Sequence, residues 1–184
     1  KIADEIGDKS GMGNTLGNIG MVHSYKGNYD KALEYYDRSL KIFEEIGDKS
    51  GMVHSLNNIG AVHSDKGDYD NALEYLEKSL SIQKEIGSKA IELLTTTYLY
   101  LSYRHLSRDY DEKDIHSLIK ETENREFELN FRLYELLEDS SYLEIAYTQV
   151  QDKTSEMEKK IGKKFLSYPV PKAIVEEWEK VNKK

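Results

Sequence analysis

The chain contains no cysteine and very little proline or tryptophan. Its 184 residues include two Pro and one Trp. Without cysteine there can be no disulfide framework, no thiolate metal site and no cysteine nucleophile. Chains without disulfides are typical of reducing compartments, so we expect a cytoplasmic protein.

The chain also lacks an excess of basic charge and any long apolar run. It has 26 Lys and Arg against 34 Asp and Glu, a net charge of −8, and its two halves, divided at residue 90, each carry −4. Nucleic acids and anionic membranes are bound largely through basic charge, so both partners are disfavoured. No apolar stretch approaches the roughly 18 residues that span a bilayer, and no signal peptide is recognisable.

An internal repeat of forty residues is the dominant feature of the sequence. Residues 1–47 are identical to residues 41–87 at 31 of 47 positions. The clearest unit runs from 50 to 89, and its apolar residues recur every three or four positions, which predicts helices. Because residues 1–7 match the end of a unit, the sequence predicts that this chain is a piece of a longer protein.

The unit resembles a tetratricopeptide repeat (TPR), a helix–turn–helix module. Leu56, the Ile59–Gly60 pair and His63 stand at the family's helix positions, and Gly67-Asp68-Tyr69 followed by Ala72 matches its turn and second helix. The family's closing proline is missing. The length of forty is similar to a subclass found in Pins-type G-protein regulators and bacterial signalling proteins. The resemblance is strong over residues 1–90 and weaker beyond them.

The resemblance implies an all-α, right-handed superhelix, or solenoid, of antiparallel helix pairs. Small residues, Gly20 with Ala32 and Gly60 with Ala72, are expected where the two helices of a unit approach most closely. The predicted organisation is 1–7, the end of a preceding repeat; 8–47, the first repeat; 48–87, the second; 88–123, a divergent third; 124–158, a degenerate helix pair; and 159–184, a proline-containing linker with a C-terminal capping helix.

Local signals predict several boundaries. Asp8 is expected to cap a helix that continues to about Lys26, and Gly27 to end it. A second helix is expected over Tyr29–Ile46. The third repeat fits best with a shift of forty-two residues, which aligns His105 with His63, and its second helix is predicted at 112–123. The final helix is predicted at about 171–182, after the two prolines.

No catalytic constellation is visible. The glycines lie in a helical pattern rather than after a strand, so no phosphate-binding loop is predicted. His23, His63 and His105 are interpreted as one packing position repeated in separate layers, and not as a metal site. We therefore expect no enzyme activity, no metal and no cofactor.

The resemblance also implies a binding surface, because the first helix of each repeat lines the concave groove in this family. The positions it indicates are Asn14, Gly17, Met21, Ser24 and Tyr25 in the first repeat, His54, Asn57, Ala61, Ser64 and Asp65 in the second, and Thr96, Leu99, Tyr103 and Leu106 in the third. Asn18 and Asn58 recur at the groove edge, where an amide holds a peptide backbone or, equally well, joins two helices. The predicted peptide-binding set is Asn14, Asn18, Met21, Tyr25, His54, Asn57, Asn58, Asp65, Thr96, Leu99 and Tyr103.

The best-known groove of the family clamps the C-terminal carboxylate of chaperones with Lys, Asn, Asn, Lys and Arg. Those positions hold Gly17, Met21, Asn58, Thr96 and Tyr100 here. Only the third matches and no cation remains, so a chaperone-tail receptor is disfavoured. An amphipathic or extended segment with apolar anchors fits better.

Three hypotheses for function follow. The first is a non-catalytic interaction module that binds a peptide segment or partner domain in its groove. The second is a regulatory or sensor segment of a larger signalling protein, such as a cyclase, kinase or transcriptional regulator. The third is a scaffold that self-associates through exposed tyrosines.

Overall fold

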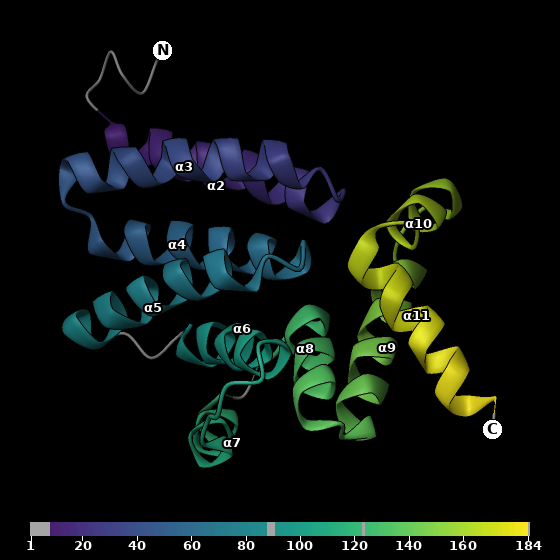
Figure 1. Cartoon of the computed structure of the whole chain (residues 1–184). Coiled ribbons are helices and arrows are strands. Elements are labelled where there is room, and N and C mark those ends of the chain that lie inside the picture. Colours follow the sequence, from purple (N-terminus) through teal and green to yellow (C-terminus); the bar gives the residue numbers. More distant parts are fainter. Residues whose placement is uncertain (1–7, 88–90, 123, 184) are drawn as a thin grey trace.

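The computed structural model describes residues 8–87, 91–122 and 124–183, and within these ranges all regular secondary structure is α-helical, as predicted (Figure 1). Its elements are α2 (Lys9–Tyr25), α3 (Tyr29–Ile46), α4 (Lys49–Asp65), α5 (Tyr69–Ile86), α6 (Glu92–His105), α7 (Glu112–Glu121), α8 (Phe127–Leu137), α9 (Ser140–Ser155), α10 (Lys159–Phe165) and α11 (Pro169–Asn182). The expected tail of an earlier helix at residues 1–7 lies outside the described residues. None of the described helices has the combination of length and apolar character that a bilayer crossing requires.

The first two hairpins begin and end where local signals predict. The Asp8 carboxylate accepts a hydrogen bond from the Gly11 amide at 2.6 Å, and Asp48 repeats this contact with Gly51 at 3.0 Å. Each side chain satisfies one of the amides left unpaired at a helix start. At the turn that follows the first helix, Gly27 has φ +73°, a conformation that costs glycine little because it has no Cβ.

The two helices of each hairpin approach closely at a glycine. A Cβ at Gly20 would lie 2.7 Å from the ring of Tyr36, and one at Gly60 would lie 2.6 Å from Cγ of Leu76. Both distances are shorter than side chains tolerate, so these positions must stay small. This confirms the glycine half of the predicted close approach, and Ala32 and Ala72 are fully buried opposite.

The predicted forty-two-residue register of the third repeat is wrong. Ser107 has φ 54° and stands forty residues after Gly67, which has φ 78°. In the turn itself, the Arg108 amide donates to the carbonyl of Tyr103 at 2.8 Å, just as the amide forty residues earlier donates to the carbonyl of His63. The turn therefore keeps the forty-residue spacing, with serine in the left-handed position.

The forty-residue register places Tyr100 where the earlier repeats have glycine. Its ring lies 4.8 Å from that of Tyr110 and its hydroxyl donates to Asp114 at 3.4 Å. A tyrosine at this position separates the third pair, and α7 packs on α6 much less extensively than α3 packs on α2. His105 also differs from His63, because it stacks on Tyr69 of the preceding repeat, with ring centroids 4.2 Å apart.

The C-terminal helices pack on the array and turn back beside it. α8 and α9 form an antiparallel pair, and Trp178 of α11 stacks on Tyr147 of α9 with ring centroids 4.8 Å apart. The segment expected to be a linker includes the short helix α10. α11 begins earlier than predicted, at Pro169, because proline at the first helical position needs no amide partner and has a suitable φ.

Because α8 to α11 turn back beside the hairpins, a hollow lies between the two parts. In Figure 1 the hairpins stack from top to bottom, and α8 to α11 stand to the right, facing the ends where each first helix turns into its second. The α2–α3 turn lies close to the start of α11, since a Cβ at Gly27 would lie 3.0 Å from Cγ of Pro169. The concave side is thus bounded by the hairpin turns and by the C-terminal helices.

Candidate partner-binding groove

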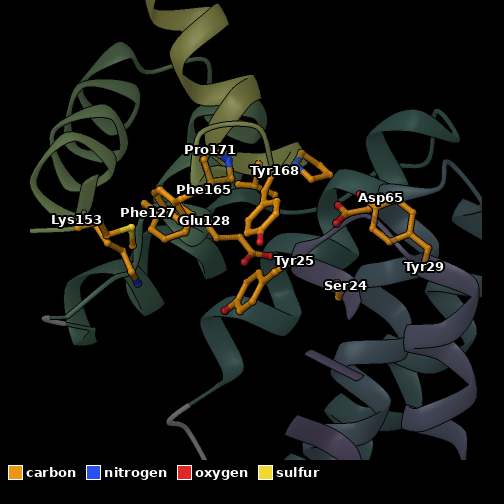
Figure 2. A pocket seen from close by; sticks show the side chains of 13 residues that line it. Ser24, Tyr25, Tyr29, Asp65, Phe127, Glu128, Lys153, Phe165, Tyr168 and Pro171 are labelled. Atoms are coloured by element: carbon orange, nitrogen blue, oxygen red, sulfur yellow. The ribbon is translucent and has the colours of Figure 1, made fainter. Parts of the chain in front are cut away.

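Two adjoining cavities occupy this hollow. The first has a volume of about 230 Å³ and is lined by Ser24, Tyr25, Tyr29, Asp65, Phe127, Glu128, Lys153, Met157, Phe165, Tyr168, Pro169, Val170 and Pro171 (Figure 2). The second has a volume of about 540 Å³ and is lined by Tyr29, Ser64, Asp65, Tyr69, Leu101, Arg104, His105, Phe131, Arg132, Glu135, Pro169, Val170 and Ala173. Because they share Tyr29, Asp65, Pro169 and Val170, we treat them as one groove.

The walls of the first cavity are mostly apolar, and five of the thirteen lining residues are aromatic. Phe127 and Phe165 meet edge to face with centroids 6.0 Å apart. In Figure 2 the Glu128 side chain lies in the middle of the cavity, with Tyr25 below it and Tyr168 above it in this view. Apolar walls with a few polar groups are typical of binding sites.

A buried ion pair lies between the two cavities. The guanidinium of Arg132 on α8 donates to Asp65 on α4 at 2.6 Å and to Glu135 at 2.7 Å. The side chains of Arg132 and Asp65 are only 14% and 10% exposed. The same guanidinium lies 5.6 Å from the ring centroid of Tyr98, whose hydroxyl donates to Glu128 at 2.8 Å. This cluster joins the second repeat to the C-terminal helices.

Burial is the main cause of the pKa shifts in the groove, and neighbouring carboxylates add to it. Burial raises the pKa of Asp65 to about 6, with Glu128 and Glu135 adding to the effect and Arg132 opposing it. Burial, reinforced by Glu128, likewise raises the pKa of Tyr25. The tyrosine hydroxyl therefore stays protonated and is available as a hydrogen-bond donor.

Comparison with known families gives a decisive match. A sequence profile described as Tetratricopeptide repeat matches residues 11–85 and 51–112, which together make up more than half of the chain. The chain belongs to the TPR family. TPR repeats are in general protein–protein interaction modules, and they are typically non-catalytic. A comparison with curated proteins gave no match.

The structure brings together four of the groove residues that the sequence indicates for this TPR domain, since Ser24 lines the first cavity and Ser64 the second, together with two members of the predicted peptide-binding set. Tyr25 and Asp65 both line the first cavity. Four others are exposed on α2 and α4 but line neither cavity: Asn14, Asn18, Met21 and His54. The hollow lies at the turn ends of the hairpins, whereas these residues lie farther back along the helices.

The remaining predicted residues lie away from the groove. Asn57 is buried, and its Oδ1 accepts a hydrogen bond from Thr95 at 2.9 Å, so it joins α4 to α6. Asn58 is half-buried and lines neither cavity. Thr96, Leu99 and Tyr103 line a separate cavity between α5, α6 and α7. They were placed by the forty-two-residue register, and the wrong register moved the prediction to another face of α6.

Several groove residues of this TPR domain were missed. Under the forty-residue register, Leu101, Arg104 and His105 are the equivalents of Ala61, Ser64 and Asp65, and all three line the second cavity. A strict repeat length would have found them. Phe127, Arg132 and Val170 belong to helices outside the clear repeats, and no periodic signal could have placed them here.

No group of three or more His, Asp or Glu side chains that could hold a metal ion occurs in the part of the chain that the structure describes. The His63 ring stacks on Tyr75, and its Nδ1 lies 3.0 Å from a carboxylate oxygen of Asp68. His23 stacks on Tyr35 in the equivalent way.

Proposed function

We propose that this TPR domain binds a segment of a partner protein in the groove between the hairpin turns and α8–α11. The observation that supports it is the continuity of the two cavities through Tyr29, Asp65, Pro169 and Val170. A groove that continues from one cavity into the next suits a chain that places successive side chains in successive pockets.

The composition of the groove also supports this proposal. The first cavity offers aromatic surface for an apolar anchor, and the second adds the side chains of Ser64, Arg104 and Glu135. An extended segment carries amides and carbonyls that need such polar partners once they leave water. Buried aromatic anchors surrounded by polar groups are typical of residues that dominate binding energy.

The test compares two tyrosines of the same chain. Peptides would be selected from a displayed random library against the purified domain, and their affinities measured for wild type, Tyr29→Ala and Tyr103→Ala. Tyr29 lines both cavities, whereas Tyr103 lies on the face between α5 and α7, with its hydroxyl 3.0 Å from a carboxylate oxygen of Glu77. We expect Tyr29→Ala to weaken binding by about 30-fold, the loss of a typical aromatic hot spot of ~2 kcal/mol.

Tyr103→Ala serves as the matched control, and we expect it to leave the affinity within about twofold. Circular dichroism of both variants checks that the fold is retained. Selected peptides that bind Tyr29→Ala as tightly as wild type would contradict the proposal, and loss of binding only in Tyr103→Ala would move the site to the other face of α6.

A further inference from the structure

The first cavity has more negative than positive charge around it. Asp65 and Glu128 line it, whereas Arg132 and Glu135 line the second cavity, where the Arg132 guanidinium pairs with both Asp65 and Glu135. The cation in the lining of the first cavity is Lys153, which lies over the Phe127 ring, 5.4 Å from its centroid. An uncompensated negative charge in a partly buried site is costly, and a cation placed there relieves that cost.

The raised pKa values of Asp65 and Tyr25 show that this site binds protons more tightly than usual. Asp65 and Tyr25 both hold their protons to higher pH than usual, because burial and neighbouring carboxylates disfavour more negative charge. The contribution of Glu128, which is common to both shifts, also attracts a positively charged group placed in the cavity.

The walls of the cavity suit an apolar stem that ends in a positive charge. The rings of Tyr25, Phe127, Phe165 and Tyr168 line it, and the faces of such rings attract cations. Lys153 on Phe127 is a contact of this kind within the chain itself. The volume of about 230 Å³ is below the roughly 300–1,000 Å³ of sites for drug-sized ligands, so it suits a single side chain.

We infer that the first cavity holds one Lys or Arg side chain of the partner segment, with its stem between the aromatic rings and its charge beside Glu128 and Asp65. This inference rests on the proposed function and names the chemistry that the groove selects. An anionic side chain would meet two carboxylates, and a purely apolar one would desolvate Glu128 and add nothing to its hydrogen bond from Tyr98.

The test uses N-acetyl-arginine amide as the probe and N-acetyl-citrulline amide as its neutral counterpart of nearly the same shape. Each is titrated into isotopically labelled protein, and amide chemical shifts are followed by NMR. We expect the arginine derivative to shift the signals of Tyr25, Glu128 and Tyr168 and to bind at least about fivefold more tightly than the citrulline derivative, as one partly screened charge contact predicts.

Three variants assign the effect to charge in this cavity. Glu128→Gln keeps an oxygen that can accept the Tyr98 hydroxyl but removes the charge, and it should weaken arginine binding about fivefold. Glu144→Gln makes the same chemical change at an exposed position on α9 that lines neither cavity, and it should have no effect. Lys153→Gln removes the competing cation and should strengthen binding about two- to fivefold.

Equal affinity for the two derivatives, no shift at these residues up to the solubility limit, or equal effects of Glu128→Gln and Glu144→Gln would each overturn the inference. Such results leave the groove intact as a binding site for uncharged segments. Failure of the proposed function is recognised separately, by selected peptides that ignore Tyr29→Ala.

Discussion

Gly60 provides the sharpest test of how the hairpins are packed. Replacing a helical glycine by alanine normally stabilises a helix by about 1 kcal/mol. At this position, however, the new Cβ would lie 2.6 Å from Cγ of Leu76 and 3.4 Å from the carbonyl oxygen of Ala72. Leu76 is fully buried, so it has no free space into which to move. Overpacking of this kind costs about 1–3 kcal/mol, so we expect Gly60→Ala to lower the free energy of unfolding by about 1 kcal/mol overall.

Gly17 on α2 is the matched control, because it has the same residue type in a helix interior without the close neighbour. A Cβ there would lie 3.6 Å from Oγ of Ser39, an ordinary van der Waals distance. We expect Gly17→Ala to raise the free energy of unfolding by about 0.5–1 kcal/mol through helix propensity alone.

Urea unfolding followed by far-ultraviolet circular dichroism measures both variants, and similar slopes would show that the same surface is exposed on unfolding. Opposite signs for the two substitutions support the packing argument. If Gly60→Ala stabilises the protein as much as Gly17→Ala does, α4 and α5 separate without cost and the argument fails.

Three further outcomes are expected. Arg132→Ala should lower the free energy of unfolding by about 3–5 kcal/mol, because it leaves the buried Asp65 carboxylate unpaired. An unchanged urea midpoint would show that the pair is not buried in solution. The pKa of Asp65 is raised from 3.8 to about 6, so the folded state binds a proton that the unfolded state releases. The free energy of unfolding should therefore fall as pH rises from 4 to 7, by up to about 3 kcal/mol relative to Asp65→Asn at the same pH values. Parallel pH curves for the two proteins would refute this. Ser107→Gly should raise the thermal midpoint, with a gain of up to about 1 kcal/mol in the free energy of unfolding. The reason is that serine here adopts the left-handed conformation that glycine adopts in the turns at Gly27 and Gly67. A lowered midpoint would contradict the turn geometry.

The helices of the first two repeats were predictable because their determinants are local. Asp8 and Asp48 cap helices through amides three residues away, and Gly27 and Gly67 provide the turns. These signals act over a few residues, and near-identical repeats state them twice. Tyr25 and Asp65 could be assigned to the groove for the same reason, since the repeat fixes their helix position.

The third repeat was not predictable in the same way, because one residue contradicts the pattern. Tyr100 stands at a glycine position, and sequence reasoning shifted the register by two residues to avoid it. The structure instead keeps the register and separates the helices, with the Tyr100 ring packed toward Tyr110. Because of that wrong inference, Thr96, Leu99 and Tyr103 were assigned to the groove although they lie on another face of α6.

By itself, the sequence determined the family, the all-α architecture and the helix boundaries of the first repeats, because caps, turns and apolar spacing depend on residues three or four positions apart. Only the tertiary structure decided where the groove lies. Its central contact joins Asp65 to Arg132, residues 67 positions apart. Whether such residues meet depends on the sum of all helix packing angles between them, and no local pattern in the chain encodes that sum.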